Sequence, residues 1–168
     1  MDIKKTAENQ LNIVEKLLNT IPGFKGYYDR ELRRDSDHVQ RQFIADKMKN
    51  LKDDMQKVIR VVAREKRMDV LTEYDEVLRG MDKFINEVTY ANRGYSGFFD
   101  LVKIGEAELE AIYQFDIQIV ECVEEFTRKF DLLSNDPLNI NQVRLFRNSL
   151  DQIESVFRDR NAILNKWQ

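Results

Sequence analysis

A heptapeptide of glycine, an aromatic residue, any residue, glycine, two aromatic residues and aspartate occurs twice in the chain. The first copy spans residues 23–29 (GFKGYYD) and the second spans residues 94–100 (GYSGFFD). Four of the six glycines in the sequence belong to these two copies. Glycine enters the left-handed region of backbone space without a Cβ clash, so paired glycines are typical of places where a helix ends and the chain reverses. We predict two turns, each of which buries its own aromatic side chains.

Apolar residues recur at intervals of three and four in the segments between and beside these turns. This spacing places them on one face of a helix and indicates amphipathic helices. The chain holds only 2 prolines, and its 42% hydrophobic and 34% charged residues are typical of a globular domain. The predicted helices cover residues 2–21, 37–66, 69–93, 106–133 and a last segment that begins at Pro137, with Asp136 as its cap.

No glycine or proline interrupts the chain near Arg67, so residues 37–93 are compatible with one continuous helix. We favour a short αα-hairpin at residues 67–69, because such long helices are rare in globular domains. The hairpin returns the chain to its starting end and brings the two turns together. We then expect one aromatic cluster of Phe24, Tyr27, Tyr28, Tyr95, Phe98 and Phe99.

These patterns predict an all-α fold, an antiparallel helical bundle of four main helices preceded by an N-terminal amphipathic helix. At 168 residues the chain fits a single domain, residues 1–168, with residues 1–21 docking separately on the bundle or on a second copy. An apolar spacing near 3.5 in residues 39–62 is typical of a coiled coil. The charged run at residues 29–37 has too few apolar residues to pack closely, and Ser36 or Asp37 is expected to cap the next helix.

The net charge gives the chain no overall attraction to nucleic acid or anionic lipid, because 27 basic and 30 acidic residues leave a net charge of −3. The basic run at the hairpin, from Lys57 to Arg67, is predicted to be a solvated tip without the recognition helix or stacking aromatics of a nucleic-acid reader. We expect neither a nucleic-acid partner nor a membrane partner. A single cysteine, no signal peptide and no apolar run of about 20 residues favour a cytoplasmic location.

Asp116 is the most informative ionisable residue, because it falls on the apolar stripe of the predicted helix 106–133. An ionised carboxylate there is costly unless it is paired. We predict a buried pair with Arg93 or Tyr95 that fixes the second turn. The alternative is a small pocket that binds a ligand or partner and is formed by Asp116 with Tyr90, Arg93, Tyr95 and Tyr113.

Patterns that carry catalysis or bind metals are not found. A di-iron bundle needs Glu-x-x-His on two helices, and His38 is the only histidine. Cys122 is expected to act as a small hydrophobic residue. The Gly-x-x-Gly turns lack the preceding strand and the following Lys-Ser/Thr of a phosphate-binding loop. We therefore expect no enzymatic activity, no metal and no cofactor.

Three segments together resemble a group of uncharacterised all-helical proteins from bacteria and archaea. They are residues 22–27 (PGFKGY), residues 31–37 (ELRRDSD) and residues 94–100 (GYSGFFD). The resemblance runs from about residue 20 to about residue 130. It implies that both turns belong to the framework of the fold, and it implies no particular activity.

The leading functional expectation is a non-enzymatic interaction or scaffolding module that binds a protein partner, including another copy of itself. Two alternatives stay open. The first is a small-molecule-binding bundle with its site around Asp116 and the tyrosines. The second is a peripheral membrane protein that uses its first helix.

Overall fold

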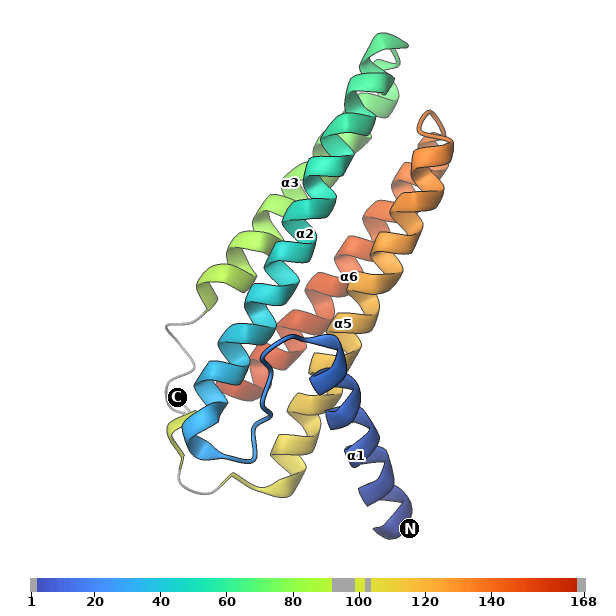
Figure 1. Ribbon diagram of the computed structural model, residues 1–168. Coiled ribbons are helices and arrows are strands. Elements are labelled where there is room, and N and C mark those ends of the chain that lie inside the picture. Colours follow the sequence, from blue (N-terminus) through green and yellow to red (C-terminus); the bar gives the residue numbers. More distant parts are fainter. Residues whose placement is uncertain (1–2, 92–98, 102–103, 166–168) are drawn as a thin grey trace.

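The computed structural model describes residues 3–91, 99–101 and 104–165. In this part of the chain every regular element is helical, and the helices pack against one another, which confirms the predicted all-α class (Figure 1). The elements are α1 (Ile3–Thr20), a short 3-10 helix η1 (Arg30–Leu32), α2 (Arg33–Arg64), α3 (Met68–Tyr90), α5 (Glu106–Asn135) and α6 (Ile140–Asn165).

The chain reverses between α2 and α3, as predicted. Lys66 has φ +56, in the left-handed region that glycine normally occupies, and it turns the backbone where no glycine is present. The amides of Glu65 and Lys66 donate to the carbonyls of Val62 and Ala63 and so close the last turn of α2. The two helices then lie side by side along their length (Figure 1).

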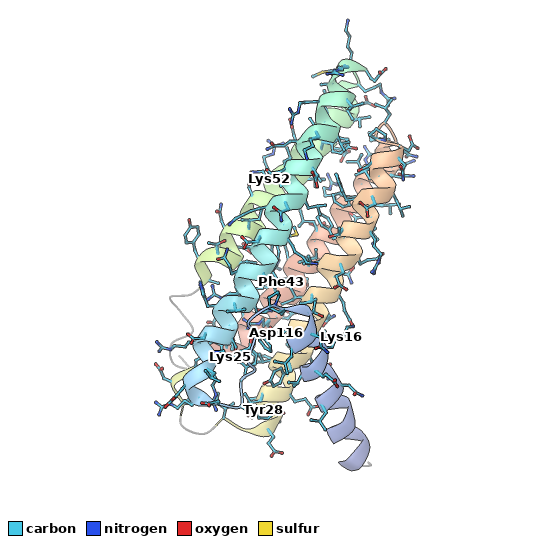
Figure 2. The ribbon with its side chains drawn as sticks, viewed as in Figure 1. Lys16, Lys25, Tyr28, Phe43, Lys52 and Asp116 are labelled. Carbon is cyan, nitrogen blue, oxygen red and sulfur yellow. The ribbon has the colours of Figure 1, made fainter. Side chains whose placement is uncertain are left out.

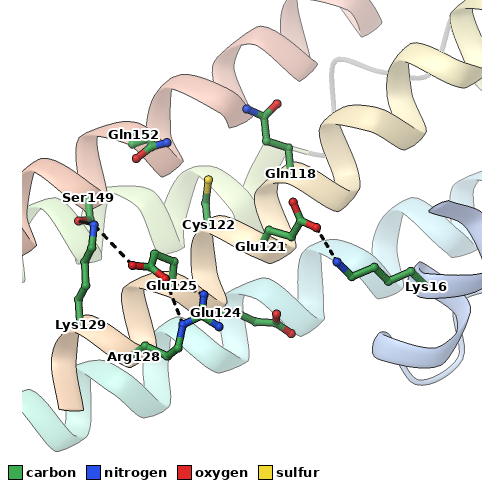
Figure 3. A pocket seen from close by; sticks show the side chains of 10 residues that line it. All are labelled: Lys16, Gln118, Glu121, Cys122, Glu124, Glu125, Arg128, Lys129, Ser149 and Gln152. Atoms are coloured by element: carbon green, nitrogen blue, oxygen red, sulfur yellow. Dashed lines mark hydrogen bonds and ion pairs between the residues drawn. The ribbon is translucent and has the colours of Figure 1, made fainter. Parts of the chain in front are cut away.

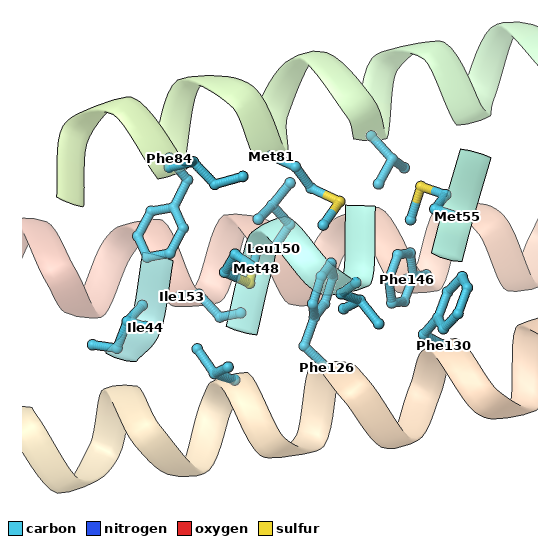
Figure 4. Close-up of a cluster of buried hydrophobic side chains, with 14 of the residues drawn as sticks. Ile44, Met48, Met55, Met81, Phe84, Phe126, Phe130, Phe146, Leu150 and Ile153 are labelled. Atoms are coloured by element: carbon cyan, nitrogen blue, oxygen red, sulfur yellow. The ribbon is translucent and has the colours of Figure 1, made fainter. Parts of the chain in front are cut away.

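The main core lies among α2, α3, α5 and α6 (Figure 4). Phe126 of α5 stacks on Phe146 of α6 with ring centroids 4.0 Å apart, and Phe84 of α3 meets Phe157 of α6 edge-on at 5.6 Å. Fully or nearly buried positions recur every seven residues on each of these helices, and all of them belong to this one apolar cluster. These positions are Met48, Met55 and Val62; Val70, Val77 and Phe84; Ile119, Phe126 and Leu133; and Val143, Leu150 and Phe157.

The first helices of the two pairs end as far apart along the chain as the two heptapeptides begin. The interval from Gly23 to Gly94, which start the two heptapeptides, equals the interval from Arg64 to Asn135, which end α2 and α5.

The predicted start of the last helix at Pro137 is wrong, because the chain first makes a further turn in which the amide of Asn139 donates to the carbonyl of Asp136. The side chain of Asn139, rather than Asp136, then accepts from the amide of Gln142 in the first turn of α6.

Helix α1 packs against α5 through its C-terminal half. Leu17 and Ile21 are completely buried in a second apolar cluster that includes Ile112 and Val120 of α5 and Leu164 of α6. Its N-terminal end points away from the other helices (Figure 1). This second cluster adjoins the turn at residues 22–29, so α1 and the turn cover the same end of α5.

Candidate functional site

The first glycine turn is fitted closely onto α5. Gly23 and Gly26 have φ values of +84 and +86, as the heptapeptide predicts. A Cβ on Gly26 would lie 2.9 Å from Tyr113 Oη, so this position needs glycine for space as well as for its backbone conformation. The close approach lets the amide of Tyr27 donate to Tyr113 Oη at 2.5 Å.

The ring of Tyr27 lies at the centre of an aromatic cluster. Its centroid is 5.4 Å from Phe24, 5.2 Å from Tyr113 and 6.0 Å from Phe99. Tyr28 is exposed, and its ring centroid lies 5.6 Å from that of Tyr113. Four members of the predicted cluster therefore meet, together with Tyr113, while Tyr95 and Phe98 lie outside the described residues.

Asp116 lies on α5 behind these rings, at the end of the helices that also holds the turn (Figure 2). It is completely buried, and both of its carboxylate oxygens accept hydrogen bonds. Arg160 Nε of α6 donates to Oδ1 at 2.5 Å, and Gln40 Nε2 of α2 donates to the same atom at 2.9 Å. Tyr27 donates its hydroxyl to Oδ2 at 2.6 Å. One carboxylate thus joins the turn, α2, α5 and α6.

Asp37 extends this contact into a network of four buried charges. Arg160 Nη2 donates to Asp37 Oδ1 at 2.7 Å, and Arg41 Nε donates to Asp37 Oδ2 at 2.8 Å. Arg41 also donates through Nη1 to the carbonyl of Val88 near the end of α3. Two guanidinium groups and two carboxylates balance in formal charge, which is the condition under which such groups are tolerated in a protein interior.

Burial shifts the protonation equilibria of this network. Burial alone would lower the pKa of the Arg160 guanidinium, but the charges of Asp116 and Asp37 outweigh it and hold that pKa well above its usual value. Burial raises the pKa of the Asp116 carboxyl, while Arg160 and the Tyr27 hydroxyl act in the opposite direction. Burial and the Asp116 charge raise the pKa of Tyr27 well above 10. Arg160 is therefore a permanent cation that needs its two carboxylates.

Three buried polar atoms of the network have no hydrogen-bond partner within the part of the chain that the structure describes. They are Arg41 Nη2, Arg160 Nη1 and Gln40 Oε1. Two are donors and one is an acceptor, so together they have the bonding capacity for a small polar group. All three side chains are at most 1% exposed, which leaves no open route to them from solvent.

The prediction that residues 29–37 do not pack closely is wrong for Arg33, Ser36 and Asp37, which are buried. The polar groups of the turn explain why. Arg33 donates to the carbonyls of Tyr27 and Leu101, both at 2.8 Å. Ser36 donates to the carbonyl of Gly26 at 2.9 Å and accepts from the amide of Lys25. Neither Ser36 nor Asp37 caps α2, because the helix already begins at Arg33.

The proposed site residues fall in different places. Tyr113 and Asp116 lie one turn apart on α5 and belong to the same buried region. Tyr90 is 74% exposed at the end of α3 and contributes nothing to the contacts of Asp116 described above. Arg93 and Tyr95 lie outside the described residues. The partners of Asp116 that the structure shows are instead Arg160, Tyr27 and Gln40.

Sequence reasoning did not predict that Arg160, Asp37 and Arg41 pair inside the protein, although a signal was present. Arg160 follows Ile153 and Phe157 in the buried phase of α6, and Asp37 and Arg41 precede Ile44 and Met48 in the buried phase of α2. Charged residues of opposite sign on the buried faces of two helices indicate an internal ion pair between those helices.

A polar surface groove of about 520 Å³ runs between α5 and α6 (Figure 3). Lys16 of α1 reaches Glu121 at one side, and Lys129 Nζ donates to Ser149 Oγ at 2.8 Å at the other. Cys122 lines the groove, and burial together with the charge of Glu121 raises the pKa of its thiol. The groove therefore offers a protonated thiol and side chains that are largely paired with each other.

The described residues contain no group of three His, Cys, Asp or Glu side chains placed to hold a metal ion. None of the described helices is long and apolar enough to cross a membrane. Comparison of the chain with protein families, curated proteins and solved structures gave no match.

Proposed function

We propose that the chain is a non-enzymatic helical interaction module, in which α1 presents an apolar face to a second copy of the chain. The observation that carries this proposal is the exposure of Leu11 (69%) and Leu18 (45%). These leucines are seven residues apart, so they lie on the same side of α1. Each leucine buried against a partner contributes about 1.5–3 kcal/mol.

We also infer the architecture that holds α1 in place. Helices α2, α3, α5 and α6 form an antiparallel four-helix bundle, and α1 docks on it through Leu17 and Ile21. The two helix pairs and the seven-residue interval of the buried positions support this arrangement. In this architecture the face of α1 that carries Leu11 and Leu18 points away from the bundle and is the binding element.

The non-enzymatic part of the proposal rests on how the ionisable groups are used. Asp116, Asp37, Arg41 and Arg160 are paired with one another inside the protein, away from any substrate. The thiol of Cys122 has a raised pKa, opposite to the shift that activates a nucleophilic cysteine. These groups stabilise the fold rather than supply a reactive centre.

Small-molecule binding around Asp116 is the second candidate, and the three unpaired atoms of the network favour it. The complete burial of Asp116 and Arg160 counts against it, because a ligand enters only if the helices separate. Saturating the protein with small carboxylates, amides and polyols while recording thermal unfolding tests this candidate. A concentration-dependent rise in Tm that Asp116→Asn abolishes would favour it over self-association.

Self-association is tested with point variants of the full chain. Removing α1 is unsuitable because Leu17 and Ile21 belong to the core. Multi-angle light scattering is expected to give a dimer for the unaltered chain and a monomer for Leu11→Ser/Leu18→Ser. The control is Leu132→Ser/Leu145→Ser, which removes two leucines of similar exposure from α5 and α6 and is expected to remain dimeric. An unaltered chain that stays monomeric at every concentration reached would contradict self-association.

A further inference from the structure

The tip of the α2–α3 hairpin, defined here as residues 57–69, gathers basic side chains. It holds five basic residues, Lys57, Arg60, Arg64, Lys66 and Arg67, against Glu65 and Asp69. Lys57 pairs with Asp54, and Arg67 pairs with Asp69. Arg60, Arg64 and Lys66 have no acidic partner among the described residues. The tip therefore carries positive charge on a chain whose net charge is −3.

Apolar side chains are exposed at the same tip. Met68, the first residue of α3, is 69% exposed, and Val61 is 49% exposed. The hairpin extends beyond the end of the α5–α6 pair, so neither of those helices covers its tip (Figure 1). A projecting surface thus combines uncompensated cations with apolar groups that water solvates poorly.

The turn of the α5–α6 pair shows that a hairpin in this fold can close without basic side chains. That turn occupies the corresponding place in the second helix pair, and residues 130–143 contain no lysine or arginine. They include Asp131 and Asp136 instead. At the α2–α3 tip, Lys66 occupies a left-handed conformation that glycine adopts at lower cost. Chain reversal alone therefore does not account for the basic residues.

We propose that the α2–α3 tip binds anionic lipid surfaces. In this arrangement Met68 and Val61 enter the boundary between headgroups and acyl chains, while Arg60, Arg64 and Lys66 contact the lipid phosphates. The long stems of the basic side chains allow their charges to reach the headgroups while the helix ends stay close to the surface. This inference does not depend on self-association through α1.

The exposed methionine and valine favour a lipid surface over a nucleic acid. A phosphate backbone uses the cations but gains nothing from these two side chains, and non-specific single-strand binders add aromatic residues on which bases stack. The tip has no aromatic residue between positions 57 and 69. A lipid surface uses both the charge and the apolar area.

Membrane binding is tested by co-sedimentation of the full chain with phosphatidylcholine vesicles that contain or lack phosphatidylserine. We expect binding to the anionic vesicles only, and weaker binding as ionic strength rises. Each basic residue near such a surface contributes about fivefold to the partition coefficient, so Arg60→Gln/Arg64→Gln/Lys66→Gln is expected to reduce binding by about a hundredfold. Met68→Ser is expected to reduce it by about fivefold, because it removes apolar area.

Two matched controls separate the tip from general surface effects. Lys25→Gln/Arg79→Gln/Arg158→Gln changes the net charge by the same amount at exposed sites elsewhere and is expected to bind anionic vesicles as the unaltered chain does. Leu132→Ser, at a site 67% exposed on α5, is the control for Met68→Ser.

Three results would overturn the lipid proposal. The first is no sedimentation with anionic vesicles at low ionic strength. The second is an equal loss of binding in the tip variants and in their controls. The third is tight binding to random DNA or RNA that the triple tip substitution abolishes while vesicle binding is unchanged, which would assign the tip to nucleic acid. The self-association variant Leu11→Ser/Leu18→Ser leaves the tip intact, so the two proposals fail separately.

Discussion

Arg160 Nε donates to Asp116 Oδ1 at 2.5 Å, and neither side chain has any exposed surface. The two residues belong to α6 and α5, and through Tyr27 and Asp37 the same pair reaches the first turn and α2. Elements far apart in the sequence therefore meet at a single ionic contact. This contact explains how a charged residue on an apolar stripe is compatible with a stable fold.

Asp116→Asn is expected to destabilise the protein by about 3–5 kcal/mol, because it leaves the buried Arg160 cation short of one partner. Urea denaturation measures the change as a shift in midpoint. Asp82→Asn is the matched control, since it removes a carboxylate from an exposed ion pair with Lys52 and should cost about 0–1 kcal/mol. Equal effects of the two substitutions would contradict the role given to the network.

Gly26→Ala is expected to destabilise the protein more than Gly23→Ala. Both glycines have positive φ, so each substitution costs about 1–2 kcal/mol of backbone strain. A Cβ at Gly26 also meets Tyr113 Oη at 2.9 Å, whereas at Gly23 the nearest atom is Val39 Cγ1 at 3.8 Å. Thermal unfolding of the two variants gives the comparison. Similar Tm values would show that the turn shifts away from α5 without cost.

Gly80→Ala tests the close contact between α3 and α6. A Cβ on Gly80 would lie 2.7 Å from Leu150 Cδ2 in the core. Alanine favours a helix by about 1 kcal/mol over glycine, but overpacking costs about 1–3 kcal/mol, so we expect a net loss of stability. In a Leu150→Val background the same substitution should become less costly. An increase in stability in the original background would contradict the contact.

The protein is expected to lose stability as the pH rises above about 10. Burial raises the pKa of Tyr113 to about 12, and burial together with the Asp116 charge raises the pKa of Tyr27 well above its usual value. The unfolded chain releases these protons near pH 10 while the folded protein keeps them, so the free energy of unfolding falls as the pH rises through this range. Tyrosinate absorbance and circular dichroism should change together. Full ionisation of all tyrosines with the helices intact would contradict this account.

Much of the fold follows from the sequence alone. Apolar periodicity located the helices to within a few residues, and the glycines located the first turn. The reversal at Lys66 was predicted from helix length only, because its turn residue is a lysine in a conformation that no local pattern indicates. The start of α2 at Arg33 was missed, because the Arg33 guanidinium is satisfied by the carbonyls of Tyr27 and Leu101, and those contacts exist only after the chain folds.

The candidate site was predicted only in part, because its contacts also exist only after the chain folds. Asp116 was conspicuous on an apolar stripe, and Tyr113 lies beside it as expected. Which side chains pair with Asp116 depends on which helices face each other, and the sequence does not specify that directly. Arg160 is 44 residues away along the chain and was therefore passed over in favour of arginine and tyrosine residues nearer to Asp116.

The placement of the four buried charges has a consequence for helix alignment. Buried apolar positions recur every seven residues on α6, so this helix would present a similar apolar face after sliding by one repeat, about 10 Å. Such a slide would carry Arg160 away from both carboxylates and leave two ions, Arg160 and Asp116, unmatched in an apolar interior, since Asp37 keeps its pair with Arg41. The four buried charges therefore favour one axial alignment of the helices over alignments that are shifted by one seven-residue repeat.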